Sequence, residues 1–184
     1  MTFFFDLSSL LSLTSPVSLR LATPTDLPNL LALLAQVVPL MLAAGNRQWS
    51  ADYPNEAVFR ADMEAGHLWV AELEGQLAGF AALTHNHQDA EYAQADWDFA
   101  EPALVTHRLA VAPAAQGRGV AAALLAQAET LARQQGLRAL RVDTNSENAA
   151  TQQLFPKLGY RFAGEITLAF RPGLRFFCYE KRLA

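Results

Sequence analysis

The chain has 184 residues, of which 52% are hydrophobic and 17% charged, and its formal net charge is −4. This length fits one domain with a sizeable core, and the apolar composition excludes an intrinsically disordered chain. The acidic balance argues against a general nucleic-acid-binding protein. The single cysteine, Cys178, allows no internal disulfide and no cysteine-ligated zinc, and the four histidines lack the spacing of metal ligands, so we expect no metal.

Residues 1–16 form an apolar segment with three consecutive phenylalanines and one charged side chain, Asp6. The segment has no lysine or arginine and is too short to span a bilayer. We therefore expect either an extension that packs on the domain or on a partner, or an over-long start. In each case the segment is expected to be dispensable for chemistry and not to be a signal peptide or a membrane anchor. The domain itself is predicted to occupy residues 17–184 of a cytoplasmic protein.

Hydrophobic periodicity and the positions of proline and glycine predict the strands and helices that follow this extension. The predicted elements, in chain order, are a strand at 17–22, helices at 27–44 and 56–65, a hairpin of strands at 68–74 and 76–84, a strand at 105–111, a helix from 120 to about 135, a strand at 139–143, a helix at 148–158, and strands at 161–170 and 176–181. Pro39 is expected to kink or end the first helix. The polar segment 85–102 is predicted to be a loop, either a solvated surface or a wall of a binding site.

Residues 105–135 carry the pattern that bears most directly on function. An apolar run that predicts a buried strand is followed by a glycine-rich loop and then by apolar residues at helical spacing. In the loop, Gly117 and Gly119 flank Arg118. The first turn of a helix has unpaired amides and partial positive charge, and glycine lets an anion approach them closely. Arg118 adds a charge whose planar fork matches a phosphate. The loop is therefore predicted to hold a phosphate or pyrophosphate.

These residues resemble the GNAT superfamily of N-acetyltransferases. The loop Gln116-Gly117-Arg118-Gly119-Val120-Ala121 fits the family's (Arg/Gln)-x-x-Gly-x-(Gly/Ala) signature, and Leu109-Ala110-Val111 stands where the family has its Leu-x-Val strand. A later stretch, from Asp143-Thr144-Asn145 through Asn148-Ala149 to Leu158-Gly159-Tyr160, resembles its second coenzyme A motif. The resemblance covers nearly the whole chain. It implies an α/β fold of order β-α-α-β-β-β-α-β-α-β-β, with helices on both faces of a mixed sheet, and it implies acetyl-CoA as the co-substrate.

The resemblance also implies how acetyl-CoA is held. The backbone of Leu109, Ala110 and Val111 is expected to pair with the pantetheine arm, and the amides of residues 116–121 to hold the pyrophosphate. Asn145 and Asn148 are expected to hydrogen-bond the pantetheine or to fix the end of the preceding strand. The alternative, helix capping before Ala149, suits Asn145 better than Asn148.

Phe155 departs from the family pattern. It stands where many relatives have a tyrosine whose hydroxyl protonates the departing thiolate, and a phenylalanine cannot do this. We therefore expect the thiolate to leave without a dedicated acid or to be protonated through water.

The predicted function is transfer of an acetyl group from acetyl-CoA to a primary amine by direct attack. The acceptor is a small molecule or a peptide, and the sequence does not distinguish an amino acid, a polyamine or a protein N-terminus. Trp49, Tyr53 and Trp97 are the candidates to line the acceptor pocket, although each is equally a candidate core anchor. We expect no nucleic-acid or membrane partner, and a homodimer is compatible with this interpretation.

His107 is the candidate proton acceptor. It lies two residues before Leu109 and four before Val111, so strand alternation predicts that the three side chains share one face. An ordinary histidine pKa of about 6.5 leaves the ring mostly neutral at pH 7 and able to take a proton from an ammonium. The structural alternative is a buried histidine that hydrogen-bonds a neighbouring carbonyl.

Two other functions fit parts of the sequence. Residues 117–122 also match the G-x-G-x-x-A fingerprint of dinucleotide-binding folds, and Asp143 stands roughly where a ribose-binding acid would lie. Five residues separate this loop from its strand, however, and too few residues follow Asp143 for the remaining β-α units. The second alternative is a non-catalytic coenzyme A-binding module on the same fold, because a fold does not determine a function.

Overall fold

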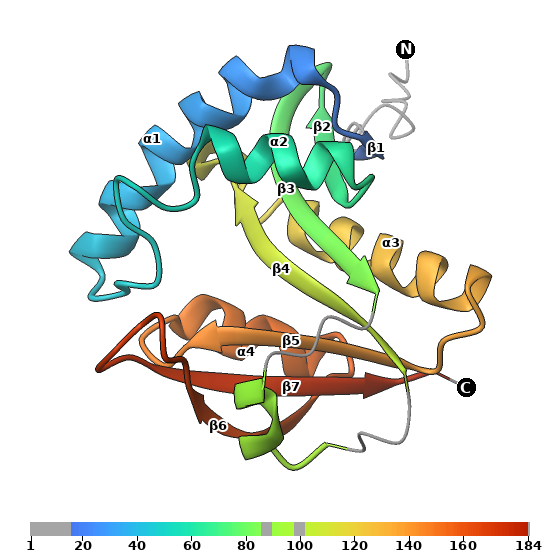
Figure 1. Cartoon of the computed structure of the whole chain (residues 1–184). Helices are drawn as coiled ribbons and strands as arrows, with labels where there is room; N and C mark the ends of the chain where they lie inside the picture. The colour runs from blue at the N-terminus through green and yellow to red at the C-terminus, as the bar shows by residue number, and fades with distance from the viewer. Residues whose placement is uncertain (1–15, 86–89, 98–101, 184) are drawn as a thin grey trace, which may run out of the picture.

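A computed structural model describes residues 16–85, 90–97 and 102–183. Apart from Pro16, the predicted N-terminal extension lies outside the described residues. The elements, in chain order, are β1 (Ser18–Leu21), α1 (Leu27–Ala43), α2 (Glu56–Glu64), β2 (Leu68–Leu73), β3 (Gln76–His85), β4 (Ala103–Val111), α3 (Val120–Gln134), β5 (Ala139–Asn145), α4 (Ala149–Lys157), β6 (Arg161–Thr167) and β7 (Arg175–Arg182) (Figure 1). This order of strands and helices is the predicted one, and the α/β fold class is confirmed.

The strands of the described chain form one mixed sheet in the order β1-β2-β3-β4-β5-β7-β6. Strands β4 and β5 are parallel, and the other neighbouring pairs are antiparallel. The β4–β5 pairing begins at Ala103–Ala139 and stops at Thr106–Val142, although both strands continue. Beyond that point the carboxyl ends of the two strands diverge, as the ribbons in Figure 1 show. The sheet therefore has a gap at its centre, between the unpaired carboxyl ends of β4 and β5, whereas the amino ends of these strands remain paired.

Helices cover both faces of the sheet, as predicted. Helices α1 and α2 bury leucines and Phe59 against Phe80 on one face, whereas α3 and α4 pack on the other face around Leu124 and Phe155. A third cluster joins the 3₁₀ turn η3 (Ala90–Gln94) to β6 and β7. By length and composition alone, Pro24–Ala43 could cross a membrane. Its buried leucines nevertheless belong to the core that covers the sheet.

Helix α1 does not end at Pro39 but continues to Ala43. A proline inside a helix leaves the carbonyl of the fourth preceding residue without its donor. Here Pro39 and that residue, Ala35, both lie on the exposed side of the helix, where water can bind the carbonyl. The helix can therefore continue past the proline.

Gly79 in β3 allows α3 to lie close to the sheet. A Cβ atom at this position would lie 2.7 Å from the carbonyl oxygen of Ala110 and 2.7 Å from Cγ1 of Val120. Real Cβ atoms essentially never approach other atoms this closely. The first residue of α3 therefore packs directly on β3 and β4, and the start of the helix is fixed beside the open centre of the sheet.

An ion pair ties the edge of the sheet to the start of α1. The Arg20 guanidinium of β1 donates to both carboxylate oxygens of Asp26 at 2.7 Å, and also to Glu72 of β2 at 2.6 Å. Asp26 further accepts a hydrogen bond from the amide of Thr23 at 2.7 Å. The hydrogen bond from Arg20 is the largest cause that holds the pKa of Asp26 down at about 2, and burial of the carboxylate opposes it.

We predict that Asp26→Asn lowers the free energy of unfolding at pH 7 by about 1–2 kcal/mol, since one pKa unit corresponds to about 1.4 kcal/mol and the partly exposed Arg20 is screened by solvent. Because the pKa of Asp26 is lower in the folded chain, this stabilisation is complete above about pH 4 and is lost as the pH falls toward 2. Urea unfolding between pH 2 and 5 measures it. The exposed-site control Asp52→Asn should follow the wild type, and equal pH dependence for wild type and Asp26→Asn would contradict the prediction.

Candidate active site

A β-bulge in β4 lies at the open centre of the sheet. Ala82 of β3 pairs with His107, but Phe80 pairs with Ala110, so two β4 residues, Arg108 and Leu109, stand opposite one β3 residue. Arg108 has a φ of 52°, a left-handed conformation that residues other than glycine rarely adopt. The neighbouring structure must therefore hold the backbone at this residue in place.

The side chain of Arg108 is held by Asp62 of α2. Its Nε and Nη2 atoms donate to the two oxygens of Asp62 at 2.8 and 2.7 Å, and Nη1 donates to the hydroxyl of Tyr53 at 3.4 Å. The two charged side chains are only 16% and 11% exposed. Burial acts to lower the pKa of Arg108, but the charge of Asp62 and the hydrogen bonds outweigh it and raise that pKa above its ordinary value. The bidentate ion pair between Arg108 and Asp62 thus holds the bulge in place.

The bulge reverses the side-chain alternation of β4, because one extra residue shifts every following side chain to the other face. His107 pairs with Ala82, which belongs to the core under α1 and α2. Leu109 and Val111 pack instead on the core under α3. The prediction that His107, Leu109 and Val111 share one face is therefore wrong.

A cleft of about 610 Å³, here called the main cleft, occupies the opening between β4 and β5. It is bordered by the end of β4, the glycine loop and first turn of α3, residues 142–144 of β5, and α4. Most of the residues predicted to hold acetyl-CoA border it: Leu109, Ala110, Val111, Gln116, Gly117, Gly119, Val120, Ala121, Asn148 and Phe155. The structure thus gathers two separate sequence motifs around one cleft.

The glycine loop presents backbone amides to the main cleft. Gly117 and Gly119 have φ values of 74° and 83°, and Gly119 is the N-cap of α3. A Cβ atom at either glycine would meet nothing within 4 Å, so the space beside the loop is open. In the described chain, the amides of Gly117, Gly119 and Val120 donate to no backbone carbonyl. Open space and free amides at a helix start fit a pyrophosphate.

Three of the predicted acetyl-CoA residues have other contacts in the structure. Arg118 does not border the main cleft, because its guanidinium forms an ion pair with Glu74 in the β2–β3 turn. Asn145 is buried, and its side chain accepts a hydrogen bond from the amide of Glu147 at 2.9 Å. Asn148 borders the cleft and is also the N-cap of α4, with its side chain accepting from the Thr151 amide at 3.4 Å. The capping alternative thus describes Asn148 better than Asn145.

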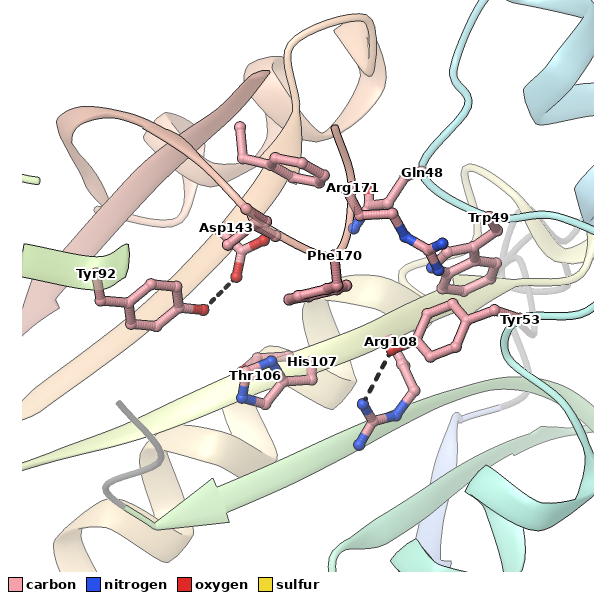
Figure 2. A pocket seen from close by; sticks show the side chains of 12 residues that line it. Gln48, Trp49, Tyr53, Tyr92, Thr106, His107, Arg108, Asp143, Phe170 and Arg171 are labelled. Atoms are coloured by element: carbon pink, nitrogen blue, oxygen red, sulfur yellow. Dashed lines mark hydrogen bonds between the residues drawn. The ribbon is translucent and has the colours of Figure 1, made fainter. Parts of the chain in front are cut away.

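A smaller cavity of about 70 Å³, here called the neck, adjoins the main cleft (Figure 2). Five residues border both spaces and mark where they meet: Gln48, Trp49, Thr106, Arg108 and Asp143. A third cavity, of about 460 Å³ and here called the outer cavity, shares Tyr53, His107, Arg108 and Phe170 with the neck. The neck therefore shares lining residues with both larger spaces, and Arg108 borders all three.

The neck contains two of the three aromatic residues predicted to line an acceptor pocket. Trp49 and Tyr53 both border it, and so does His107. Trp97 does not, because it is a core residue: its indole packs over the Arg141 guanidinium at 5.3 Å and donates to the carbonyl of Tyr92 at 2.9 Å. For Trp97, the alternative prediction of a core anchor is therefore correct, and the predicted place in the acceptor pocket is wrong.

Several residues of the neck were not predicted as site residues. Asp143 was placed in the second coenzyme A motif and considered as a ribose-binding acid, but not as a site residue; it borders both neck and main cleft and accepts a hydrogen bond from the hydroxyl of Tyr92. Phe170 and Arg171 come from the turn between β6 and β7. Two signals could have indicated Asp143: its place at the start of the second coenzyme A motif and its position at the diverging end of β5, since ligands favour the carboxyl ends of parallel strands.

We predict that Asp62→Asn destabilises the protein by about 2–4 kcal/mol, because it leaves the buried Arg108 charge without its counter-ion. Urea unfolding at pH 7 measures the loss. The matched control is Arg60→Ala, which breaks the exposed Arg60–Glu56 pair on the same helix and should cost less than about 0.5 kcal/mol. Equal effects of the two variants would mean that the Asp62 pair does not hold the bulge.

Comparisons with known proteins agree with this geometry. The sequence profile of the acetyltransferase (GNAT) family matches residues 34–160. The uncharacterized N-acetyltransferase YesJ of Bacillus subtilis is 26% identical over 143 residues, which are 76% of this chain and 78% of YesJ. A GNAT-family acetyltransferase from Streptococcus agalactiae superposes with a TM-score of 0.80 at 28% identity, over 93% of this chain and 98% of that one.

A further solved structure, yncA of Salmonella typhimurium, was determined with its cofactor acetyl-CoA. It superposes with a TM-score of 0.63 at 22% identity, over 92% of this chain and 95% of its own, and therefore shows a shared fold. The dinucleotide-fold alternative is wrong, because the described sheet has one parallel pair where such a fold is mostly parallel. From its profile match, its sheet and its structural relatives, the chain belongs to the acetyltransferase (GNAT) family.

Proposed function

We propose that this acetyltransferase moves the acetyl group of acetyl-CoA to a primary amine by direct attack. One observation carries the proposal: the phosphate-binding type of loop and the diverging edge of β4 border the same cleft, and the neck enters that cleft beside them. Acetyl-CoA in the main cleft and an amine in the neck would meet at Thr106, Arg108 and Asp143. Holding both reactants in this way can supply about 7–11 kcal/mol of the barrier.

In this proposal, the loop and the β4 edge hold acetyl-CoA. The amides of Gly117, Gly119 and Val120 would bind the pyrophosphate with the help of the α3 dipole. Residues 109–111 of β4 have no β5 partner, so their free edge can pair with the amide groups of the pantetheine arm. Asn148 and Phe155 would contact the same arm from α4.

The β4 bulge and His107 would supply the chemistry. Negative charge develops on the thioester oxygen as the amine attacks, and amides left out of the ladder at the bulge can stabilise it. An ammonium acceptor must first lose one proton, which His107 in the neck would take, directly or through water. A second proton passes from the attacking nitrogen to the departing sulfur. Phe155 has no acid to offer, but an ordinary thiol pKa of about 8.5 makes the thiolate an adequate leaving group.

We predict that Gly119→Val reduces acetyl-CoA affinity at least tenfold, because the side chain crowds the amides of the loop. Calorimetry measures the affinity. Gly136→Val is the matched control: it lies at the other end of α3, has a φ of 70°, and also has open space at its Cβ position. Both variants carry a similar backbone strain, but only Gly119→Val should lose affinity. Native affinity in Gly119→Val would contradict the loop assignment.

We predict that His107→Ala lowers kcat/KM at least tenfold and removes the acidic limb of its pH profile, once an acceptor has been found by thiol release from acetyl-CoA across an amine library. Rates within a few-fold of wild type, with the acidic limb unchanged, would exclude His107 from proton transfer. Acetyl-CoA binding without thiol release for any amine would support the non-catalytic module instead.

A further inference from the structure

We propose that the acceptor is a small amine that also carries a carboxylate, as a free amino acid does, with its ammonium beside Asp143 and its carboxylate at Arg171. The inference rests on the proposed function and narrows it to one class of amine. It comes from the charges placed around the neck, where a small acceptor must lie to reach the main cleft. Figure 2 shows both side chains among those that line this space.

Asp143 is placed to receive the amine. It is the only carboxylate that borders both the neck and the main cleft in the described chain, so it lies where the attacking nitrogen must pass. The hydroxyl of Tyr92 donates to one of its oxygens and fixes its orientation. A carboxylate has about four acceptor sites, so an ammonium can bind it in addition to Tyr92. An anion at this point attracts a cationic nitrogen and repels a carboxylate.

Arg171 supplies the opposite charge. Its guanidinium lies 4.6 Å from the ring centroid of Tyr53 and 5.7 Å from that of Phe170, and the residue is half-buried at the neck. No described Asp or Glu forms an ion pair with it, whereas Arg175 of the same hairpin pairs with Glu165. Aromatic contacts hold the flat faces of a guanidinium and leave the N–H edge for a ligand, and that edge matches a carboxylate.

The size of the neck favours one small molecule that bears both charges. Asp143 and Arg171 border this one small space, so a ligand that contacts both must carry its ammonium and its carboxylate close together, as an amino acid does. A polyamine would bring a second cation toward Arg171, and a protein N-terminus would bring a neutral peptide carbonyl. The outer cavity of about 460 Å³, which shares Phe170 with the neck, has room for the side chain of the acceptor.

The test compares amines that differ only in the carboxylate. The full chain is assayed for thiol release with saturating acetyl-CoA and each common L-amino acid, its carboxamide and its decarboxylated amine, with spermidine and an alanyl-glycyl-glycine peptide alongside. We expect at least a tenfold higher kcat/KM for one or more amino acids than for the matched carboxamide and amine. Stabilisation of the coenzyme A complex by that amino acid in a thermal unfolding assay gives a second readout, independent of turnover.

Variants of Arg171 and Asp143 test which residue binds the carboxylate of the acceptor and which binds its ammonium. Arg171→Gln should raise KM for the amino acid about tenfold to a hundredfold, the usual value of a charge-assisted hydrogen bond, and leave the carboxamide and amine unchanged. The KM of Arg171→Lys for the amino acid should lie between those of the wild type and Arg171→Gln, because lysine keeps the positive charge but lacks the planar, bidentate guanidinium. Arg175→Gln, the matched control in the same hairpin, should change nothing. Asp143→Asn should lower kcat/KM for all three compounds alike.

Three results would overturn the inference. They are a carboxamide or amine used as well as its amino acid, Arg171→Gln lowering the rates of all three compounds equally, and acetyl-CoA binding with no transfer to any amino acid. A protein that fails to bind acetyl-CoA at all would instead refute the proposed function, so the two failures can be told apart.

Discussion

The arrangement of this site depends on the ion pair between Arg108 and Asp62. The pair keeps one residue of β4 in a left-handed conformation, at the point where β4 and β5 separate. Because of that extra residue, Leu109 and Val111 face the core under α3, whereas His107 lies on the face covered by α1 and α2. One strand can thus border the main cleft with Leu109 and the neck with His107. The two reactants are expected on different sides of the same strand, and the bulge lets the strand serve both.

The order of elements could be predicted because its determinants are local. These determinants are the apolar periodicity, a proline after β4 and glycines at the ends of α3. Each acts over a few residues and can be recognised in the sequence. The bulge could not be predicted in this way. It results from a carboxylate on α2, 46 residues before Arg108 in the chain, and a period of two along β4 gives no sign of it. The misplacement of His107 relative to Leu109 follows directly from that missing information.

The candidate site was predictable on one side only. Most of the residues around the main cleft belong to two continuous motifs, so their spacing identifies them together. The neck is built from residues of six separate segments, among them Trp49, Tyr92, Asp143 and Arg171. Apart from Asp143, which opens the second coenzyme A motif, these residues carry no spacing signal. An aromatic such as Trp97 looks the same in sequence whether it lines a cavity or fills a core. The acceptor side therefore needs the tertiary structure.

Gly79 links the packing of the sheet to the proposed binding of acetyl-CoA, although it does not border the main cleft. Its missing side chain sets the depth at which α3 seats on β3 and β4, and the amides at the start of α3 move with the helix. A methyl group added there would lift the helix and carry the anion site away from the free edge of β4. In the proposed complex with acetyl-CoA, the distance between the two ends of the co-substrate therefore restricts which residues can replace Gly79.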